Sequence, residues 1–194
     1  MGWTNNGKKL LLLSLNYSNL QSLLTNMTLV DMENNNRQIY NYAGNYNSGG
    51  AAIFGSFVCT SNSSGYDIFR IAIGSGDTAV TENDYALDNQ IAYTNIYQTG
   101  QQPYPMTSLM VAHWGPEAID PEDGKPYIEY SITGKNTTSD PIEIKEIGLQ
   151  RQLKHTNGNN NVNYAWFLLW REVLDTPIRV AVGGTYEIKL RFKI

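Results

Sequence analysis

The chain has 194 residues, of which 41% are apolar and 16% are charged, and its formal net charge is −4. These values allow one domain with a substantial core. They also exclude several classes: Lys and Arg never gather into a patch that suits nucleic acid, the single cysteine cannot form a disulfide within the chain, and no run approaches the ~20 apolar residues of a membrane span. The 13 tyrosines, with many Asn, Gly and Ser residues, favour strands and turns over helices.

Residues 1–50 differ from the remainder and are predicted to form an N-terminal arm followed by an irregular segment. Leucines between residues 10 and 27 hint at helical spacing, but Asn and Ser interrupt it, so a short helix and an extended arm fit equally well. The leucine run after Lys8 and Lys9 is only about six residues long, shorter than the core of a signal peptide. We therefore expect the chain to be used without export.

An apolar arm outside a folded domain needs a surface to cover. We therefore expect residues 1–36 to contact other subunits, and the Tyr-rich segment 40–50 to form a loop or an irregular edge. The predicted interface residues are Leu10, Leu13, Leu20, Leu23, Tyr40, Tyr42 and Tyr46.

Strand signals recur from residue 51 onward at spacings of roughly 10–20 residues. The clearest is the last, where Tyr186, Ile188 and Leu190 alternate with charged residues, so that one face meets a core and the other meets water. The segment 164–173 is apolar on both faces, which predicts a central strand. The predicted strands are 52–59, 66–74, 91–98, 108–114, 126–134, 141–150, 164–173, 178–182 and 186–194.

Turn chemistry separates these strands. We expect Asp175-Thr176-Pro177 to turn between two of them, residues 154–163 to form a polar loop, and Gly148 to mark a bulge. A series of short strands joined in this way predicts an all-β fold. The expected architecture is an antiparallel β-sandwich of jelly-roll or Greek-key type over residues 51–194.

Three segments carry short motifs in a fixed order. The first is residues 71–78 with the Asp84-Tyr85-Ala86-Leu87 anchor, the second is residues 144–149, and the third is residues 168–178 with the Gly183-Gly184 turn after it. Together they resemble small structural proteins of tailed bacteriophages and prophages, and the resemblance covers residues 66–194. The residues that carry it are Gly74, Gly76, Asp84, Tyr85, Leu87, Glu146, Gly148, Arg171, Pro177 and Gly184.

The resemblance implies a β-sandwich component of a virion, such as a head-decoration, collar, tail or fibre-associated subunit, assembled in the host cytoplasm. It implies capsid, portal, neck or tail proteins and further copies of the chain as partners. Because no catalytic or cofactor motif stands out in the sequence, we expect no enzymatic activity and no cofactor. The charge distribution and the short apolar runs predict no nucleic acid and no membrane as a partner.

The first motif also has a local interpretation. In Gly74-Ser75-Gly76-Asp77-Thr78 the glycines are expected to allow turns with positive φ, and the Asp and Thr side chains to cap neighbouring amides. Tyr85 and Leu87 are then expected to plug the loop onto the core. A phosphate-binding role is disfavoured because the segment lacks the lysine and the strand-to-helix context of a P-loop.

The remaining candidates for chemistry favour structural roles. Arg171 is expected to pair with a carboxylate such as Glu146 or Asp175. His113 is expected to be a structural residue at a strand end, and His155 to be solvated in a polar loop. One cysteine and two separated histidines cannot supply the usual four zinc ligands.

An acidic loop is the strongest candidate for a metal site. Carboxylates on a loop could hold calcium, but the EF-hand spacing is absent, so a solvated acidic turn is the favoured reading and calcium stays the alternative. The residues concerned are Glu117, Asp120, Glu122 and Asp123.

A glycan-binding or receptor-recognition module is the main rival to the virion hypothesis. Exposed tyrosines beside Asn and Gly suit adaptable contacts with protein or sugar, although packing on edge strands is the favoured interpretation of these tyrosines. A hydrolase is a more distant third reading, because no nucleophile elbow is present. The tyrosines in polar segments are Tyr40, Tyr42, Tyr46, Tyr93, Tyr97 and Tyr104.

Overall fold

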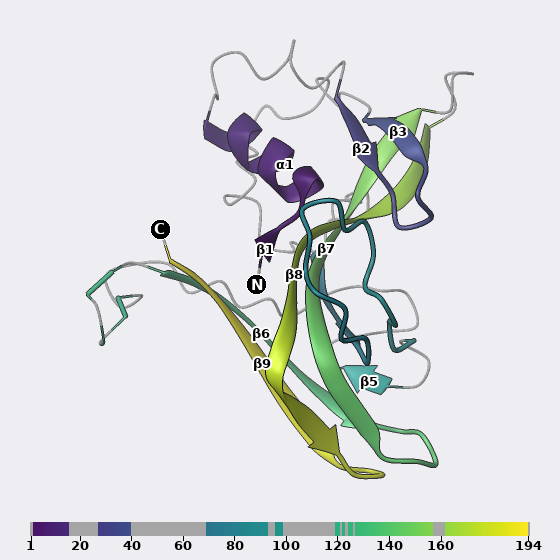
Figure 1. Ribbon diagram of the computed structural model, residues 1–194, viewed down its shortest axis with the longest axis vertical. Coiled ribbons are helices and arrows are strands. Elements are labelled where there is room, and N and C mark those ends of the chain that lie inside the picture. The colour runs from purple at the N-terminus through teal and green to yellow at the C-terminus, as the bar shows by residue number, and fades with distance from the viewer. Residues whose placement is uncertain are drawn as a thin grey trace.

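The computed structural model describes residues 2–15, 27–39, 69–92, 96–98, 119–120, 122, 124–125, 127–156 and 162–193. Most of these residues lie in β-strands, and every strand pair among them is antiparallel (Figure 1). The expectation of an antiparallel, mainly β fold is confirmed at this level. The described residues include one helix, α1 (Asn5–Leu15), and none long and apolar enough to cross a membrane. The predicted strands 52–59 and 108–114 lie outside the described residues.

The strands form two sheets. The larger sheet contains, in spatial order, β1 (Gly2–Trp3), β8 (Val162–Val180), β7 (Ile142–Thr156), β3 (Asn36–Ile39) and β2 (Thr28–Val30), with β4 (Phe69–Gly74) also paired to β7. The smaller sheet contains β5 (Ile96–Gln98), β6 (Tyr127–Asn136) and β9 (Thr185–Lys193).

Strands β6 and β7 form one side of a long two-stranded ribbon, and β8 and β9 form the other side. The ribbon passes from the smaller sheet into the larger one. β6 pairs with β9, and the continuation of the same two segments pairs as β7 with β8. The ribbon bends where residues 137–141 and 181–184 connect the sheets. The buried side chain of Asn136 donates there to the carbonyl oxygens of Asp140 (2.9 Å) and Val180 (3.1 Å). One side chain therefore joins both crossings between the sheets.

The alternating pattern of the last strand is confirmed by its burial. Tyr186, Ile188 and Leu190 are each at most 6% exposed, and the charged residues between them are exposed. These three belong to an apolar cluster shared with the larger sheet, and the ring of Phe192 lies 5.4 Å from that of Trp170. We call this cluster the shared core. Burial of apolar surface stabilises it by roughly 25 cal/mol for each Å² removed from water.

Residues 167–171 of β8 are buried on both faces, as the apolar sequence around them predicts, whereas residues 163–164 and 175–177 are exposed. The register against β7 shifts between Leu149 and Gln150. The N-terminal segment contacts β8 beside this shift: the Thr4 N–H donates to the carbonyl oxygen of Leu169 (3.0 Å), and the Thr4 hydroxyl donates to that of Leu168 (2.7 Å). Thr4 thus satisfies backbone groups at an irregular point of the ladder.

The described part of residues 1–50 belongs to the same sheet and core and forms no separate arm. β1 pairs with β8, β3 pairs with β7, and Leu10 (3% exposed) and Leu29 (0%) lie in the shared core. Leu10 is therefore used inside the subunit, contrary to its expected place in a subunit interface. The helix alternative holds for residues 5–15, which include Leu13. The other predicted interface residues, Leu20, Leu23, Tyr40, Tyr42 and Tyr46, lie outside the described residues.

Three local expectations are wrong. Gly148 keeps its ladder register, and the irregularities fall on either side of it. The expected turn at Asp175-Thr176-Pro177 stays within β8, as extra residues opposite a single residue of β7. His155 lies in β7, where it pairs with Ile39 of β3, and it is 3% exposed instead of solvated in a loop. Where both faces of a strand are covered, the alternation of apolar and polar residues no longer indicates the register of the strand or the residues at which it begins and ends.

Candidate functional site

Residues 75–91, which we call the covering loop, follow β4 and cross over β7 and β8 (Figure 1). Backbone hydrogen bonds of 2.9 Å join the two ends of the loop, one from Ser75 to Asn89 and one from Ile91 to Ile73. The loop covers the face of β7 opposite the shared core.

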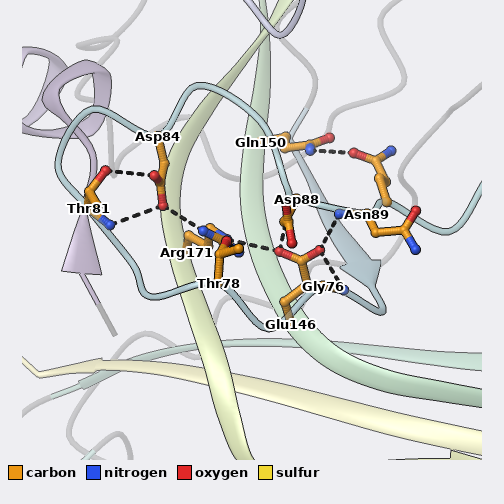
Figure 2. Close-up of polar contacts among 10 residues, drawn as sticks. Gly76, Thr78, Thr81, Asp84, Asp88, Asn89, Glu146, Gln150 and Arg171 are labelled. Atoms are coloured by element: carbon orange, nitrogen blue, oxygen red, sulfur yellow. Dashed lines mark hydrogen bonds and ion pairs between the residues drawn. The ribbon is translucent and has the colours of Figure 1, made fainter.

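Glu146 of β7 lies beneath the loop and is completely buried. Its Oε1 atom accepts hydrogen bonds from the N–H groups of Gly76 (3.1 Å) and Asn89 (2.8 Å) (Figure 2). Its Oε2 atom accepts one from the N–H of Asp88 (3.1 Å) and one from Nε of Arg171 (2.9 Å). Because a carboxylate offers about four acceptor positions, all of them are filled.

Arg171 of β8 supplies the cation, and its side chain is 2% exposed. Its Nη1 atom lies 2.8 Å from Oδ2 of Asp84, and its Nη2 atom donates to the hydroxyl of Thr78 at 3.1 Å. The expected pairing of Arg171 with Glu146 is confirmed, whereas the other candidate partner, Asp175, is exposed. We call Asp84, Glu146 and Arg171 the buried ion cluster. It joins β7, β8 and the covering loop.

Asp84 is the member of the cluster that the loop contributes. Its carboxylate also accepts hydrogen bonds from the N–H (3.2 Å) and the hydroxyl (2.7 Å) of Thr81. Burial alone would raise the pKa of Asp84, but the hydrogen bonds from Arg171 and Thr81 outweigh it and hold this pKa below its ordinary value. Burial would lower the pKa of Arg171, and its carboxylate partners raise it above its ordinary value. Both groups are therefore charged at neutral pH.

Gly74 and Gly76 permit close approach, and the expectation that they adopt positive φ is wrong. A Cβ atom at Gly74 would meet Oε1 of Glu146. A Cβ atom at Gly76 would lie 2.7 Å from the same oxygen and 2.5 Å from the Cβ atom of Asp88. The loop backbone can reach the buried carboxylate only because these side chains are absent.

Leu87 closes the apolar end of the site. It is 6% exposed and packs with Ala72 and Leu168 in a second cluster, separate from the shared core. A Cβ atom at Gly148 would lie 2.8 Å from the side chains of both Leu87 and Leu168, so glycine makes room for them. The expected role of Leu87 is confirmed. Tyr85 is 37% exposed, so the expectation that it plugs the loop onto the core is wrong.

Exposed contacts extend the site at its rim. Nζ of Lys145 lies 3.4 Å from Asp77, and Nζ of Lys8 lies 2.7 Å from Glu82. The Asn5 N–H also donates to the carbonyl oxygen of Glu82 (2.7 Å), which connects α1 to the loop. Exposed ion pairs stabilise little, so the buried ion cluster is the principal polar anchor of the loop. Asp77 and Thr78 contact cations instead of making the amide caps expected from the sequence.

The arrangement can fix a loop, but it leaves Glu146 unable to act as a base toward a substrate. That carboxylate is covered and fully hydrogen-bonded. Within the described ranges, no three His, Cys, Asp or Glu side chains are grouped to hold a metal ion. In the acidic turn, the buried Asp120 accepts a hydrogen bond from the Glu122 N–H (2.9 Å), while Glu117 and Asp123 lie outside the described residues.

The structure brings together most of the motif residues. Pro177 is exposed within β8, and Gly184, whose N–H donates to the Ala181 carbonyl oxygen (2.9 Å), lies at the ribbon bend. The sequence reasoning missed the contacts made by Thr78 and Thr81, although a threonine three residues before Asp84 is a local capping signal. The residues brought together are Gly74, Gly76, Asp84, Leu87, Glu146, Gly148 and Arg171.

These residues come from distant segments, and the contact of Asp84 with Arg171 alone joins residues 87 positions apart. The site is therefore a product of the whole fold and not of one local motif. Comparisons of the chain with protein-family models, with curated proteins and with solved structures find no match.

Proposed function

We propose that this chain is a non-enzymatic structural subunit of a bacteriophage particle, docking on capsid, neck or tail proteins and on copies of itself. The observation that carries the proposal is the convergence of the three motif segments. Residues 71–78 and 84–87, residues 144–149 and residues 168–178 meet in the covering loop and the buried ion cluster. The motif segments that resemble phage structural proteins thus form one site, and this site fixes a surface loop on the sheet.

The proposed architecture is an antiparallel β-sandwich of jelly-roll type. A jelly roll is built from a long antiparallel ribbon folded across itself. The ribbon of β6–β9, its bend at Asn136, and the shared core with residues from both sheets support this architecture.

The use of charge in the site also supports a structural role. Removing charged groups from water carries a desolvation penalty that their mutual attraction offsets only with good geometry. Here two carboxylates and a guanidinium hold a loop that carries exposed side chains such as Tyr85 and Asp88. A fixed surface loop suits a subunit that docks repeatedly in one orientation.

The test is where the chain sits in a lysate of its source. Large DNA-containing particles are separated on a density gradient, and this chain is quantified by mass spectrometry against the major capsid protein. A strain with the gene deleted serves as the control for the peptide signal. We expect the chain to co-sediment with particles.

Each outcome has a distinct meaning. An abundance close to that of the capsid protein indicates a decoration subunit, and a small fraction of it indicates a neck, tail or fibre part. Absence from the particles contradicts the proposal. A glycan array and a panel of chromogenic esters and glycosides would then separate the glycan-binding module from a hydrolase.

A further inference from the structure

We propose that the exposed outer face of β6 and β9 is a docking surface for a second copy of this chain, and that it binds the second copy's covering loop. The inference deepens the proposed function and rests on it, because it names a partner of the structural subunit.

The outer face of β6 and β9 is basic on an acidic protein. The inner face is buried through Tyr186, Ile188 and Leu190, so the alternate residues point outward. Among the charged side chains that the structure describes on these strands, three are basic and one is acidic, although the chain carries a net charge of −4. All four are exposed: Lys135, Lys189, Arg191 and Glu187. We call Lys135, Lys189 and Arg191 the basic face.

The basic face also offers an aromatic surface. The guanidinium of Arg191 lies 4.9 Å from the centre of the Tyr127 ring. Lys189 lies 3.3 Å from Glu187, so one acidic group partly offsets the positive charge. Arg and Tyr are enriched in protein interfaces relative to the rest of the surface.

The covering loop has the complementary charge. Residues 75–91 contain four acidic residues and no basic residue. Asp84 is committed to the buried ion cluster, while Asp77, Glu82 and Asp88 are exposed. Lys145 and Lys8 pair with the first two of these and reduce the negative charge without cancelling it. Tyr85 stands among these acids with 37% of its surface exposed, as an aromatic anchor would.

The loop is already held in one shape before it meets a partner. Three of its backbone N–H groups donate to Glu146, and its Asp84 pairs with Arg171. Little conformational freedom is then lost on docking, which favours binding by an otherwise modest surface.

The two surfaces are different, so the contact is head-to-tail. Such a contact leaves one unused surface of each kind at the ends of a chain of subunits, and it yields closed rings or extended arrays. Rings and arrays of one subunit fit the proposed role in a particle.

The experiment uses purified full-length chain in sedimentation velocity, over a concentration series at low and high salt. We expect self-association that weakens as salt rises. The loop variant is Tyr85→Ala with Asp88→Lys, which leaves the buried ion cluster untouched. The basic-face variant is Lys189→Glu with Arg191→Glu. Each should weaken self-association by at least about tenfold. Arg179→Glu, a reversal at an exposed arginine of β8, is the matched control and should change nothing.

Mixing the two variants is the decisive step. Each retains one intact surface, so an equimolar mixture should form a heterodimer and nothing larger. No heterodimer in the mixture, variants that assemble like the wild type, or a wild-type chain that stays monomeric would overturn the inference. None of these results bears on whether the chain co-sediments with particles, so the contact and the proposed function can fail separately.

Discussion

The central parts of β7 and β8 are buried on both faces, and different interactions stabilise the two faces. On one face, side chains such as Ile147 and Trp170 pack into the shared core. On the other face, Glu146 and Arg171 bind a loop through charge and hydrogen bonds. The apolar face gains stability from every buried group in proportion to its area. The polar face is stable only while each charged group keeps its partners.

The burial of a side chain therefore does not by itself determine how much its substitution lowers stability. Packing in an apolar core is distributed, so a change of one methylene has a limited effect. The polar face concentrates its contacts in one carboxylate and one guanidinium. We therefore expect the largest loss of stability on the polar face, when one partner of the buried ion cluster is removed.

The largest effect is expected for Arg171→Met. The variant leaves the buried Glu146 and the partly buried Asp84 without their cation, and removing one partner of a buried pair lowers the free energy of unfolding by about 3–5 kcal/mol. Urea unfolding monitored by tryptophan fluorescence measures the change. Arg179→Met, at an exposed position of β8, is the control and should stay within about 0.5 kcal/mol of the wild type. Equal small changes in both variants would refute a role for the cluster in stability.

The next effect is expected for Leu10→Ala on the apolar side. Leu10 is 3% exposed in the shared core, so its truncation should lower the free energy of unfolding by about 2–5 kcal/mol. The same urea titration on the dilute protein measures it. If Leu10 instead served a subunit interface, the dilute protein would keep its stability and lose only assembly.

A smaller effect is expected for Gly76→Ala. The added methyl group would crowd Asp88 and Glu146, and overpacking of this kind lowers stability by about 1–3 kcal/mol. Thermal unfolding followed by circular dichroism provides the measurement. Ala79→Ser, at an exposed position of the same loop, is the control. An unchanged melting temperature for Gly76→Ala would show that the loop backbone does not lie against the carboxylate.

The smallest effect is expected in the pH dependence of Asp84→Asn. The pKa of Asp84 is lowered in the folded state, so its contribution is present above the unfolded value of about 3.9 and is lost as pH falls through the lower folded value. The stability difference between wild type and Asp84→Asn should therefore be constant near neutrality and shrink below about pH 4. Asp175→Asn, which removes an exposed carboxylate, is the control. A difference independent of pH down to the acid transition would contradict a charged Asp84 in the cluster.

The sequence predicts the fold best where only one face of a strand is buried. The alternation from Tyr186 to Leu190 locates β9 and its core residues, because every second side chain meets water. The same reasoning fails along β7, where Glu146 and Ile147 are both buried, one under the loop and one in the core. Ile144 and Ile147 both lie in the shared core, so the change of phase along β7 reflects the register irregularity between Ile144 and Glu146. The sequence predicts an irregularity in this strand but places it at Gly148.

The site could be predicted only in part. The pairing of Arg171 with Glu146 follows from the rule that buried charges are paired. The contribution of Asp84 depends on a loop that returns over the sheet, and no spacing in the sequence fixes that path. Tyr85 and Leu87 are both apolar enough for a core, and only the path of the loop decides that Leu87 is buried while Tyr85 is exposed.

The central claim is that Glu146 holds the covering loop on the sheet, and native-state hydrogen exchange tests it most directly. The N–H groups of Gly76, Asp88 and Asn89 donate to the buried carboxylate. We predict that these three amides exchange as slowly as those of the β7 ladder, and far more slowly than the amide of the exposed Ala79. Exchange of these three amides at the rate of the Ala79 amide would contradict the account.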